Sequence, residues 1–251
     1  MRIPVVPTLV AIIVAASSFA LGHWQAGRAA LKQAQFAQAT AANLAQPVHL
    51  GSVSVIPEEI DHRRVMVAGE FVAADTIYLD NRQYAGQPGF LVLTPMRVEG
   101  GGPAVMINRG WMPVNPAGRE LIAPPPVPAG RVEIEGHAAL QVSSFMALRG
   151  AAAGKLGGIW PNFSFEAYVS ESGLNLQPIV VQQTSATPDG LVRDWPVPGA
   201  GTERHIGYAI QWYLMSALSV GLWIWFVVLR KRPAHEPGRD PEDTGHAAHD
   251  A

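Results

Sequence analysis

Three side chains that begin at position 205 have the types and the spacing of a ligand site. At about 3.6 residues per helical turn, His205, Tyr208 and Trp212 lie on one stripe of a helix. Partial desolvation disfavours the charged imidazole, so a histidine flanked by flat apolar rings can stay neutral and bind haem iron axially. The same pattern is typical of an interfacial histidine that hydrogen-bonds a carbonyl group or a lipid headgroup. The residues alone leave both interpretations open.

A second group of polar and aromatic residues follows the first apolar segment, in the run Leu21-Gly22-His23-Trp24-Gln25-Ala26-Gly27-Arg28. A tryptophan and an arginine at this position are typical of interfacial anchoring to lipid headgroups. Trp24 and Arg28 could instead form the side of a ligand site opposite His205, with the guanidinium facing a propionate. In that arrangement His23 would be a further, weaker candidate for a second ligand.

Two arginines in the central region are candidates for binding a carboxylate. Arg82 follows Asn81 just before a glycine-rich turn, and Arg109 lies in the run Asn108-Arg109-Gly110-Trp111. Asparagine and glycine are the residues that tight turns require, and Trp111 would fill a core. Structure therefore accounts for both motifs, and a propionate or carboxylate clamp is the alternative.

Several classes of function find no support in the sequence. There are no cysteines, which excludes disulfides, thiolate metal sites and cysteine nucleophiles, and the net charge of −2 gives no basic surface for nucleic acid. GxSxG, P-loop, GxGxxG and HExxH motifs are absent from the sequence. Catalytic groups can converge from distant positions, but the sequence offers no reason to propose an enzyme.

Two apolar segments must position these residues. No charge lies between Arg2 and His23 or between Ile206 and Leu229, and roughly 20 apolar residues suffice to cross a bilayer. Each segment predicts a transmembrane helix, residues 1–22 and 206–229, although the first could also be a cleaved signal peptide. Ala209, Ser216 and Ser219 are small and lie on the His205 stripe, so they predict close packing against the first span.

The flanks of the second apolar segment predict the topology. Arg230-Lys231-Arg232 follows it and indicates the cytoplasmic side. Both termini would then be cytoplasmic, and residues 23–205 would form a domain outside the cytoplasm. Residues 230–251 comprise this basic flank and a tail that, beyond Arg232, is rich in Pro, Gly, Asp, Glu and His, which predicts disorder.

The central region changes its periodicity near Val48. Residues 23–44 lack proline and are rich in Ala, Gln and Leu, which predicts a helical extension of the first span. Apolar alternation then predicts strands near Val65–Phe71, Thr76–Asp80, Phe90–Val98, Ala104–Asn108, Arg131–Val142 and Pro178–Gln183, with a short helix over Ser164–Ser172. The expected fold is an α+β membrane protein whose two spans flank an antiparallel, β-rich domain, with a barrel-like curled sheet as one form of it.

The order of these motifs resembles the Surfeit locus protein family of cytochrome c oxidase assembly factors. The matching residues are Leu21-Gly22 with Trp24-Gln25, Arg28 and Lys32; Gly69 and Phe71; Gly89-Phe90 with Thr94-Pro95; Asn108-Arg109-Gly110-Trp111 with Pro113; Glu135-Gly136; and His205, Tyr208 and Gln211-Trp212-Tyr213. Around Trp160 the chain departs from the family pattern, because Gly158-Ile159-Trp160-Pro161-Asn162 lacks the usual Asn two residues before the Trp.

The resemblance implies a chaperone of the bacterial inner membrane that is not an enzyme. Its central domain would be periplasmic, and its partners would be oxidase subunit I, other oxidase assembly factors and the lipid bilayer. The resemblance also implies that haem a is bound transiently, with His205 as axial ligand, Tyr208 and Trp212 as walls, and Trp24 and Arg28 opposite. A scaffold that binds no cofactor and an unrelated exported enzyme are the two alternatives.

Overall fold

The structure is a computed structural model that describes residues 4–140, 154–195 and 201–229. The chain divides into two compact units. We call Met1–Leu31 with Gly201–Ala251 the helical unit, and Lys32–Ala200 the β unit. The cationic run Arg230-Lys231-Arg232 and the tail that follows it lie outside the described residues, as does Arg2 at the other end.

The first helix, α1, spans Val5–Leu44 without interruption. Its 40 residues correspond to a length of about 60 Å at about 1.5 Å per residue. Pro7 lies in the first turn, where a missing amide donor breaks no helical hydrogen bond, and no proline follows within the helix. The sequence divided this region into a span ending at residue 22 and an extension over 23–44, and the structure has both within a single helix.

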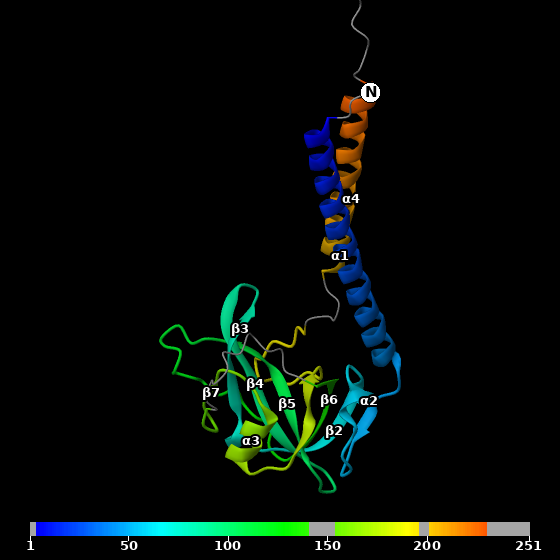
Figure 1. Cartoon of the computed structure of the whole chain (residues 1–251). Coiled ribbons are helices and arrows are strands. Elements are labelled where there is room, and N and C mark those ends of the chain that lie inside the picture. The colour runs from blue at the N-terminus through cyan, green and yellow to red at the C-terminus, as the bar shows by residue number, and fades with distance from the viewer. Residues whose placement is uncertain (1–3, 141–153, 196–200, 230–251) are drawn as a thin grey trace, which may run out of the picture. The chain divides into compact units, whose positions relative to one another are not determined.

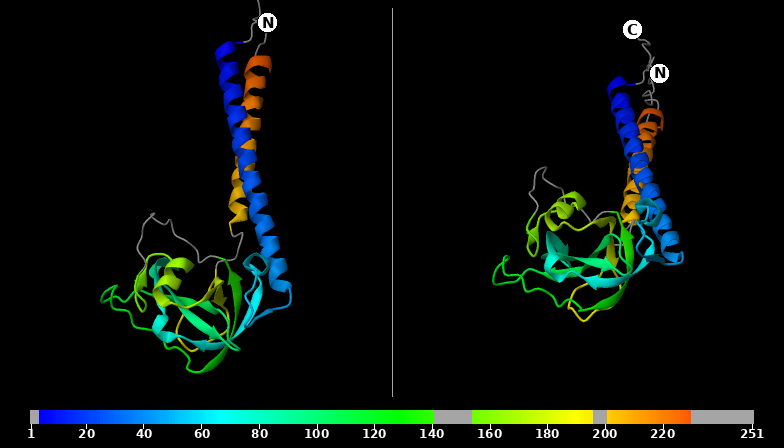
Figure 2. Two further views of the ribbon diagram at one scale, coloured as in Figure 1. Left: turned by 60° about the horizontal axis from the view of Figure 1, so that its bottom comes forward. Right: turned by 90° about the horizontal axis from the view of Figure 1, so that it is seen from below.

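The last helix, α4, spans Thr202–Ile224 and continues into the π-helical turn η2, Trp225–Leu229. Gly201 precedes it in the left-handed conformation, with φ of 86°, so the helix begins at Thr202, three residues before His205. Both α1 and α4 are long and apolar enough to cross a membrane. Figures 1 and 2 show them running side by side in every view.

The β unit contains an eight-stranded sheet, two short α-helices and a 3-10 turn. The strands are β1 (Val48–Leu50), β2 (Arg64–Phe71), β3 (Ile77–Tyr84), β4 (Gln87–Val98), β5 (Ala104–Pro113), β6 (Arg131–Ala139), β7 (Ile159–Trp160) and β8 (Leu176–Gln183); the helices are α2 (Pro57–Ile60) and α3 (Phe165–Ser172), and the turn is η1 (Ala73–Asp75). Each strand that alternation predicted has a counterpart, but β6 ends at Ala139, and residues 141 and 142 of the strand predicted over Arg131–Val142 lie outside the described residues. The strands β1 and β7 are too short to show a periodicity in the sequence.

The sheet is mixed, so the prediction of an antiparallel domain is only partly correct. The strand order is β1-β2-β6-β8-β5-β4-β3-β7, with β2 also paired to β4. These pairings form a closed circuit through β2, β6, β8, β5 and β4. However, β1–β2, β3–β7 and β5–β8 are parallel pairs. Parallel strands arise here because the chain returns to the sheet by long connections, such as the one that separates β5 from β8. The barrel-like curl stays a prediction.

Apolar side chains fill the inside of the β unit in distinct clusters. One contains Val65, Val67 and Ile134, alternate apolar residues of β2 and β6. A second contains Trp160 and Tyr168, whose rings lie 5.8 Å apart. Trp160 is fully buried and its Nε1 donates to the Lys155 carbonyl at 3.0 Å, so the segment that departs from the family pattern has a core-packing role.

Helix α3 begins and ends as its sequence predicts. The hydroxyl of Ser164 accepts a hydrogen bond from the Ala167 amide, which caps the first turn. Gly173 ends the helix with φ of 67°, a left-handed conformation that glycine adopts without strain. The Tyr168 hydroxyl donates to the Asp75 carbonyl at 2.6 Å, which joins this helix to the sheet region.

Candidate ligand site on the helix pair

Hydrogen bonds define how α1 and α4 pair. Ser216 Oγ donates to the Ala15 carbonyl at 2.9 Å, Ser219 Oγ to the Ala11 carbonyl at 3.2 Å, and Trp223 Nε1 to Thr8 Oγ1 at 3.0 Å. Advancing from Ser216 to Trp223 along α4 moves the partner back from Ala15 to Thr8 along α1. The helices are therefore antiparallel and in constant register. The prediction that Ser216 and Ser219 face the first span is confirmed.

The face of α1 that meets α4 consists almost entirely of small residues. They recur at alternating intervals of three and four: Thr8, Ala11, Ala15, Ser18, Gly22, Gln25 and Ala29. Gly22 is buried, and a Cβ built on it would lie only 3.0 Å from two ring carbons of Tyr213. Small side chains allow two backbones to approach closely, which is how membrane helices gain contact without a hydrophobic driving force. Gln25 is the large polar exception in this stripe.

Gln25 forms a hydrogen bond with the predicted ligand His205. The distance between His205 Nδ1 and Gln25 Oε1 is 2.7 Å, across 180 residues of sequence. Both side chains are half-buried. Because the bond occupies Nδ1, the other ring nitrogen, Nε2, is the one left for a ligand. An imidazole and an amide thus sit together at one end of the stripe.

The other predicted site residues lie on the same two helices. On α1 the guanidinium carbon of Arg28 lies 5.7 Å from the centroid of the Trp24 ring, a cation–π contact one turn apart. Trp24 is 53% exposed and Tyr208 is 52% exposed, whereas Trp212 is half-buried. The contacts therefore link His205 with Gln25 and Arg28 with Trp24. The grouping of all five predicted residues in one site stays a prediction.

The sequence did not single out Gln25 as a site residue. A signal for it was available, because Gln25 lies three residues after Gly22 and seven after Ser18 on the small-residue stripe. That spacing places it opposite α4 once the two helices are known to pair. The sequence does not reveal the register between the two helices, and this register places Gln25 opposite His205 rather than one turn away.

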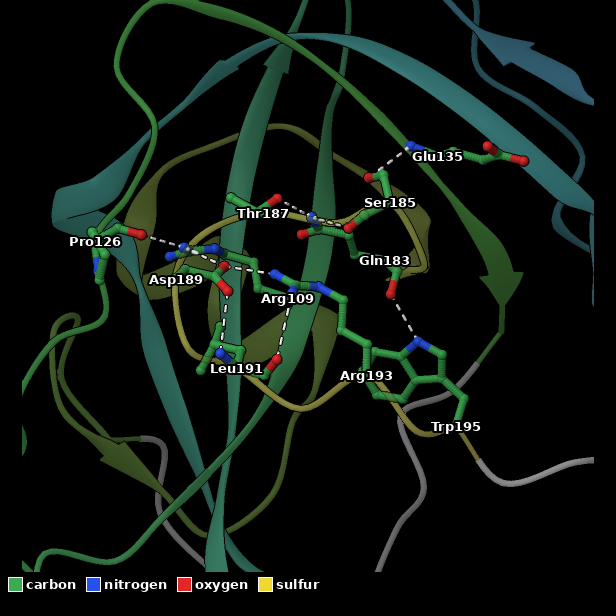
Figure 3. Close-up of polar contacts among 10 residues, drawn as sticks. All are labelled: Arg109, Pro126, Glu135, Gln183, Ser185, Thr187, Asp189, Leu191, Arg193 and Trp195. Carbon is green, nitrogen blue, oxygen red and sulfur yellow. Dashed lines mark hydrogen bonds and ion pairs between the residues drawn. The ribbon is translucent and has the colours of Figure 1, made fainter.

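Arg109, the alternative carboxylate clamp, binds a carboxylate of its own chain. Its Nη2 donates to Asp189 Oδ2 at 3.0 Å and to the Pro126 carbonyl at 2.5 Å, while Arg193 Nη2 donates to the same Asp189 oxygen at 2.6 Å. Figure 3 shows the two guanidinium groups reaching Asp189 from two sides. The side chains of Arg109 and Asp189 are each only 1% exposed. Burial lowers the pKa of Arg109, and Asp189 partly restores it.

The same motif binds the segment that follows β8. Trp111 exchanges two backbone hydrogen bonds with Val192, at 2.8 and 2.9 Å. Gly110 has φ of 144°, and a Cβ there would lie 2.8 Å from Leu191 Cβ, so only glycine allows this approach. The run from Asn108 to Trp111 therefore has a structural role in the β unit, as the turn-and-core interpretation predicted.

Arg82 is buried in the β unit and forms no ion pair with the residues that the structure describes. Its Nε and Nη1 have no hydrogen-bond partner among the residues that the structure describes. Burial lowers the pKa of Arg82, and the nearby Asp80 raises it. Its backbone carbonyl accepts a hydrogen bond from Trp111 Nε1 at 2.9 Å. Arg82 thus supports the Trp111 motif through its main chain.

The chain is built from two kinds of structure. One is an antiparallel pair of helices, one from each end of the sequence, that are long and apolar enough to cross a membrane; the other is a small α+β unit with a mixed sheet. Within the described residues no group of three or more His, Cys, Asp or Glu side chains is placed to hold a metal ion. In the part of the chain that the structure describes, His205 carries an imidazole that is hydrogen-bonded across the two long helices.

Comparison with known proteins gives the family. The sequence model of the SURF1 family matches residues 12–217, and the chain therefore belongs to this family. It is 24% identical over 241 residues to a SURF1-like protein of Monosiga brevicollis, covering 88% of this chain and 86% of the relative. It is 23% identical over 235 residues to Surfeit locus protein 1 of Rattus norvegicus, covering 84% and 72%.

A third relative has a name that describes its role. The cytochrome oxidase assembly protein SHY1 of Saccharomyces cerevisiae is 30% identical over 98 residues, which is 38% of this chain and 25% of that protein. The matched region of the SURF1 family begins inside α1 and ends inside α4, so it includes both helices of the pair as well as the β unit.

Proposed function

We propose that the protein is an assembly factor for a haem–copper terminal oxidase that binds haem a and assists its delivery to oxidase subunit I. Membership of the SURF1 family and the name of the yeast relative support the assembly role. The observation that carries the haem proposal is the interhelical bond between His205 Nδ1 and Gln25 Oε1. This bond leaves an imidazole nitrogen for iron at the end of a helix pair.

The residues of the helix pair fit a haem. Imidazole is the commonest haem ligand, and a single nitrogen donor suits a protein that must later release its cargo. Exposed aromatic surface is available from Trp24 and Tyr208, and Arg28 supplies a cation for a propionate. When bound, haem a would supply an iron coordination position and a Soret absorption.

The chain's own residues would bind, orient and shield the cofactor. His205 ligates, Tyr208 and Trp212 pack against apolar surface, and Trp24 with Arg28 forms the opposite side. The stripe of small residues holds the two helices together so that these side chains keep one arrangement. Partners would be subunit I, other assembly factors and the bilayer, with no nucleic acid.

We place the protein in the bacterial inner membrane as a two-span protein. The length and apolar surface of α1 and α4 support two spans. The cationic run after α4 supports cytoplasmic termini and a periplasmic β unit. That the protein is not an enzyme stays a prediction.

A second candidate function is a scaffold that binds no cofactor and stabilises an oxidase intermediate. The same hydrogen bond favours it, because an imidazole bonded to an amide across two helices also joins those helices. In that case His205 would matter for helix pairing and not for a ligand.

One experiment distinguishes the two functions. The protein is purified in detergent from cells that make haem a, beside His205→Ala and the control His49→Ala, which changes an exposed histidine of β1. We expect a Soret band in the wild type and the control that is lost in His205→Ala. Colourless wild-type protein that still restores oxidase activity to a deletion strain would overturn haem binding and leave the scaffold.

A further inference from the structure

We infer that Gln25 is a positioning residue that sets the tautomer and the orientation of the His205 ring, so that Nε2 is the nitrogen presented to a metal-bearing ligand. The inference rests on the proposed function, because it concerns the same imidazole. It adds a residue from the other helix and a defined ring nitrogen.

The position of Gln25 is fixed by its neighbours on α1. Three residues earlier, Gly22 leaves so little space that an added Cβ would lie 3.0 Å from the Tyr213 ring. Four residues later on the same face, Ala29 is buried. Gln25 thus lies between two buried positions of the helix interface. Its amide therefore reaches His205 as part of the helix interface and not as a mobile surface group.

Hydrogen-bond chemistry gives the tautomer. An amide oxygen only accepts, so an imidazole nitrogen that pairs with Gln25 Oε1 must carry a proton. A neutral imidazole has one N–H, and with that proton on Nδ1 the lone pair is on Nε2. Metal-binding histidines usually donate their other N–H to a carbonyl or a carboxylate, which fixes the ring and raises its basicity. Gln25 meets this requirement with a bond of 2.7 Å.

A neutral amide is also a chemically distinctive partner. A carboxylate in its place would draw the Nδ1 proton more strongly and give the ring more imidazolate character, and hence a stronger bond to iron. A neutral amide oxygen orients the ring in the same way but raises its basicity less than a carboxylate would.

The test uses the full-length protein in detergent, titrated with haem a. The variants are Gln25→Leu, which cannot accept, and Gln25→Glu, which still accepts; the matched control is Gln35→Leu, an exposed glutamine of the same helix. We expect Gln25→Leu to raise the Kd about 10- to 100-fold. Gln25→Glu should bind at least as tightly as wild type, with a higher Fe–His stretching frequency in resonance Raman spectra and a lower reduction potential. Gln35→Leu should match wild type.

A further variant separates positioning from simple helix pairing. Ser216→Ala removes a different interhelical hydrogen bond, and we expect its Fe–His frequency and Kd to match wild type. Equal losses in Ser216→Ala and Gln25→Leu would overturn the inference, because Gln25 would then act only by joining the helices. A loss in Gln25→Glu as large as in Gln25→Leu would also overturn it, because the amide would then be donating to Nδ1.

The outcomes for Gln25 and for the proposed function are distinguishable. If His205→Ala loses the Soret band while both Gln25 variants match wild type in Kd and in Raman frequency, haem binding stands and the positioning role is wrong. If His205→Ala binds haem a like wild type, the proposed ligand itself is wrong and the inference falls with it. Circular dichroism of each variant confirms that the helices are retained.

Discussion

The helical unit and the β unit place their large apolar side chains in opposite ways. In the helical unit large apolar side chains such as Val6, Ile13 and Leu218 point outward, and the contact between helices is made of small residues and hydrogen bonds. In the β unit the apolar side chains are inside, and even the buried charge of Arg109 is paired with Asp189. Exposed apolar side chains are favoured in lipid, and buried ones are favoured in water.

The candidate binding residues of the two units also differ in whether they already have a partner. Arg109 binds Asp189 and the Pro126 carbonyl inside the β unit, so Asp189 already balances its charge. His205 is half-buried and is bonded through one nitrogen only. An imidazole nitrogen for a ligand is thus offered by the helical unit, whereas Arg109 in the β unit stabilises the fold, and Arg82 there keeps two guanidinium nitrogens without a partner among the described residues.

The largest expected effect is in the β unit. Asp189→Ala leaves Arg109 and Arg193 without their shared carboxylate in a buried site, and removing one partner of a buried ion pair costs about 3–5 kcal/mol. Urea unfolding of the purified protein, followed by tryptophan fluorescence, measures the change. The control Asp194→Ala alters an exposed carboxylate and should lie within about 0.5 kcal/mol of wild type. Equal unfolding midpoints for the two variants would contradict the role of Asp189.

A smaller effect is expected at the closest approach of the two helices. Gly22→Ala places a Cβ about 3.0 Å from the Tyr213 ring, and overpacking of this kind costs about 1–3 kcal/mol. Gly27→Ala is the matched control, because a Cβ there meets nothing within 4 Å. The chain has no cysteine, so disulfide formation between Ala15→Cys and Ser216→Cys reports pairing directly. We expect Gly22→Ala to slow this cross-link and Gly27→Ala to leave it unchanged; the reverse order would refute the register.

Loss of one interhelical hydrogen bond should cost less. Ser216→Ala removes the bond to the Ala15 carbonyl, and such bonds between membrane helices average about 0.6 kcal/mol. Thermal unfolding in detergent, compared with Ser17→Ala, measures the difference. Ser17 is the appropriate control because its hydroxyl donates to Ile13 within its own helix. A Ser17→Ala loss as large as that of Ser216→Ala would contradict an interhelical role.

The smallest effect concerns pH and is confined to the β unit. Burial lowers the pKa of His137, and the nearby charges of His62 and Arg64 lower it further against the opposing effect of Glu135. A histidine whose folded pKa is depressed binds protons more readily when unfolded, so stability is lost as pH falls below about 6.5 toward the folded pKa. We expect His137→Gln to flatten this decline in urea midpoints measured between pH 7 and pH 5. An unchanged slope would show that other groups cause it.

The elements within each unit were readable from the sequence, because their patterns are local. Alternation in Arg131–Glu135 gave β6, and Ser164 with Gly173 gave the ends of α3. Small residues at helical spacing gave the face of α4 that meets α1. In each case the residues that decide the structure lie within one or two turns of each other.

The long-range pairings could not be read in this way. Arg109 and Asp189 are 80 residues apart, and His205 and Gln25 are 180 apart. The parallel pairing of β5 with β8 depends on where the chain re-enters the sheet, which no local pattern encodes. Trp160 was singled out only as a departure from the family pattern, yet it is one of the largest buried side chains of the core.

In the proposed function haem a binds the helical unit and not the β unit. Titration of haem a into wild type, His205→Ala and Arg82→Gln distinguishes the two locations, because Arg82 is a buried arginine of the β unit. We expect the Soret change on binding to be lost in His205→Ala and retained in Arg82→Gln. Retention in His205→Ala with loss in a folded Arg82→Gln protein would show that haem a binds the β unit instead.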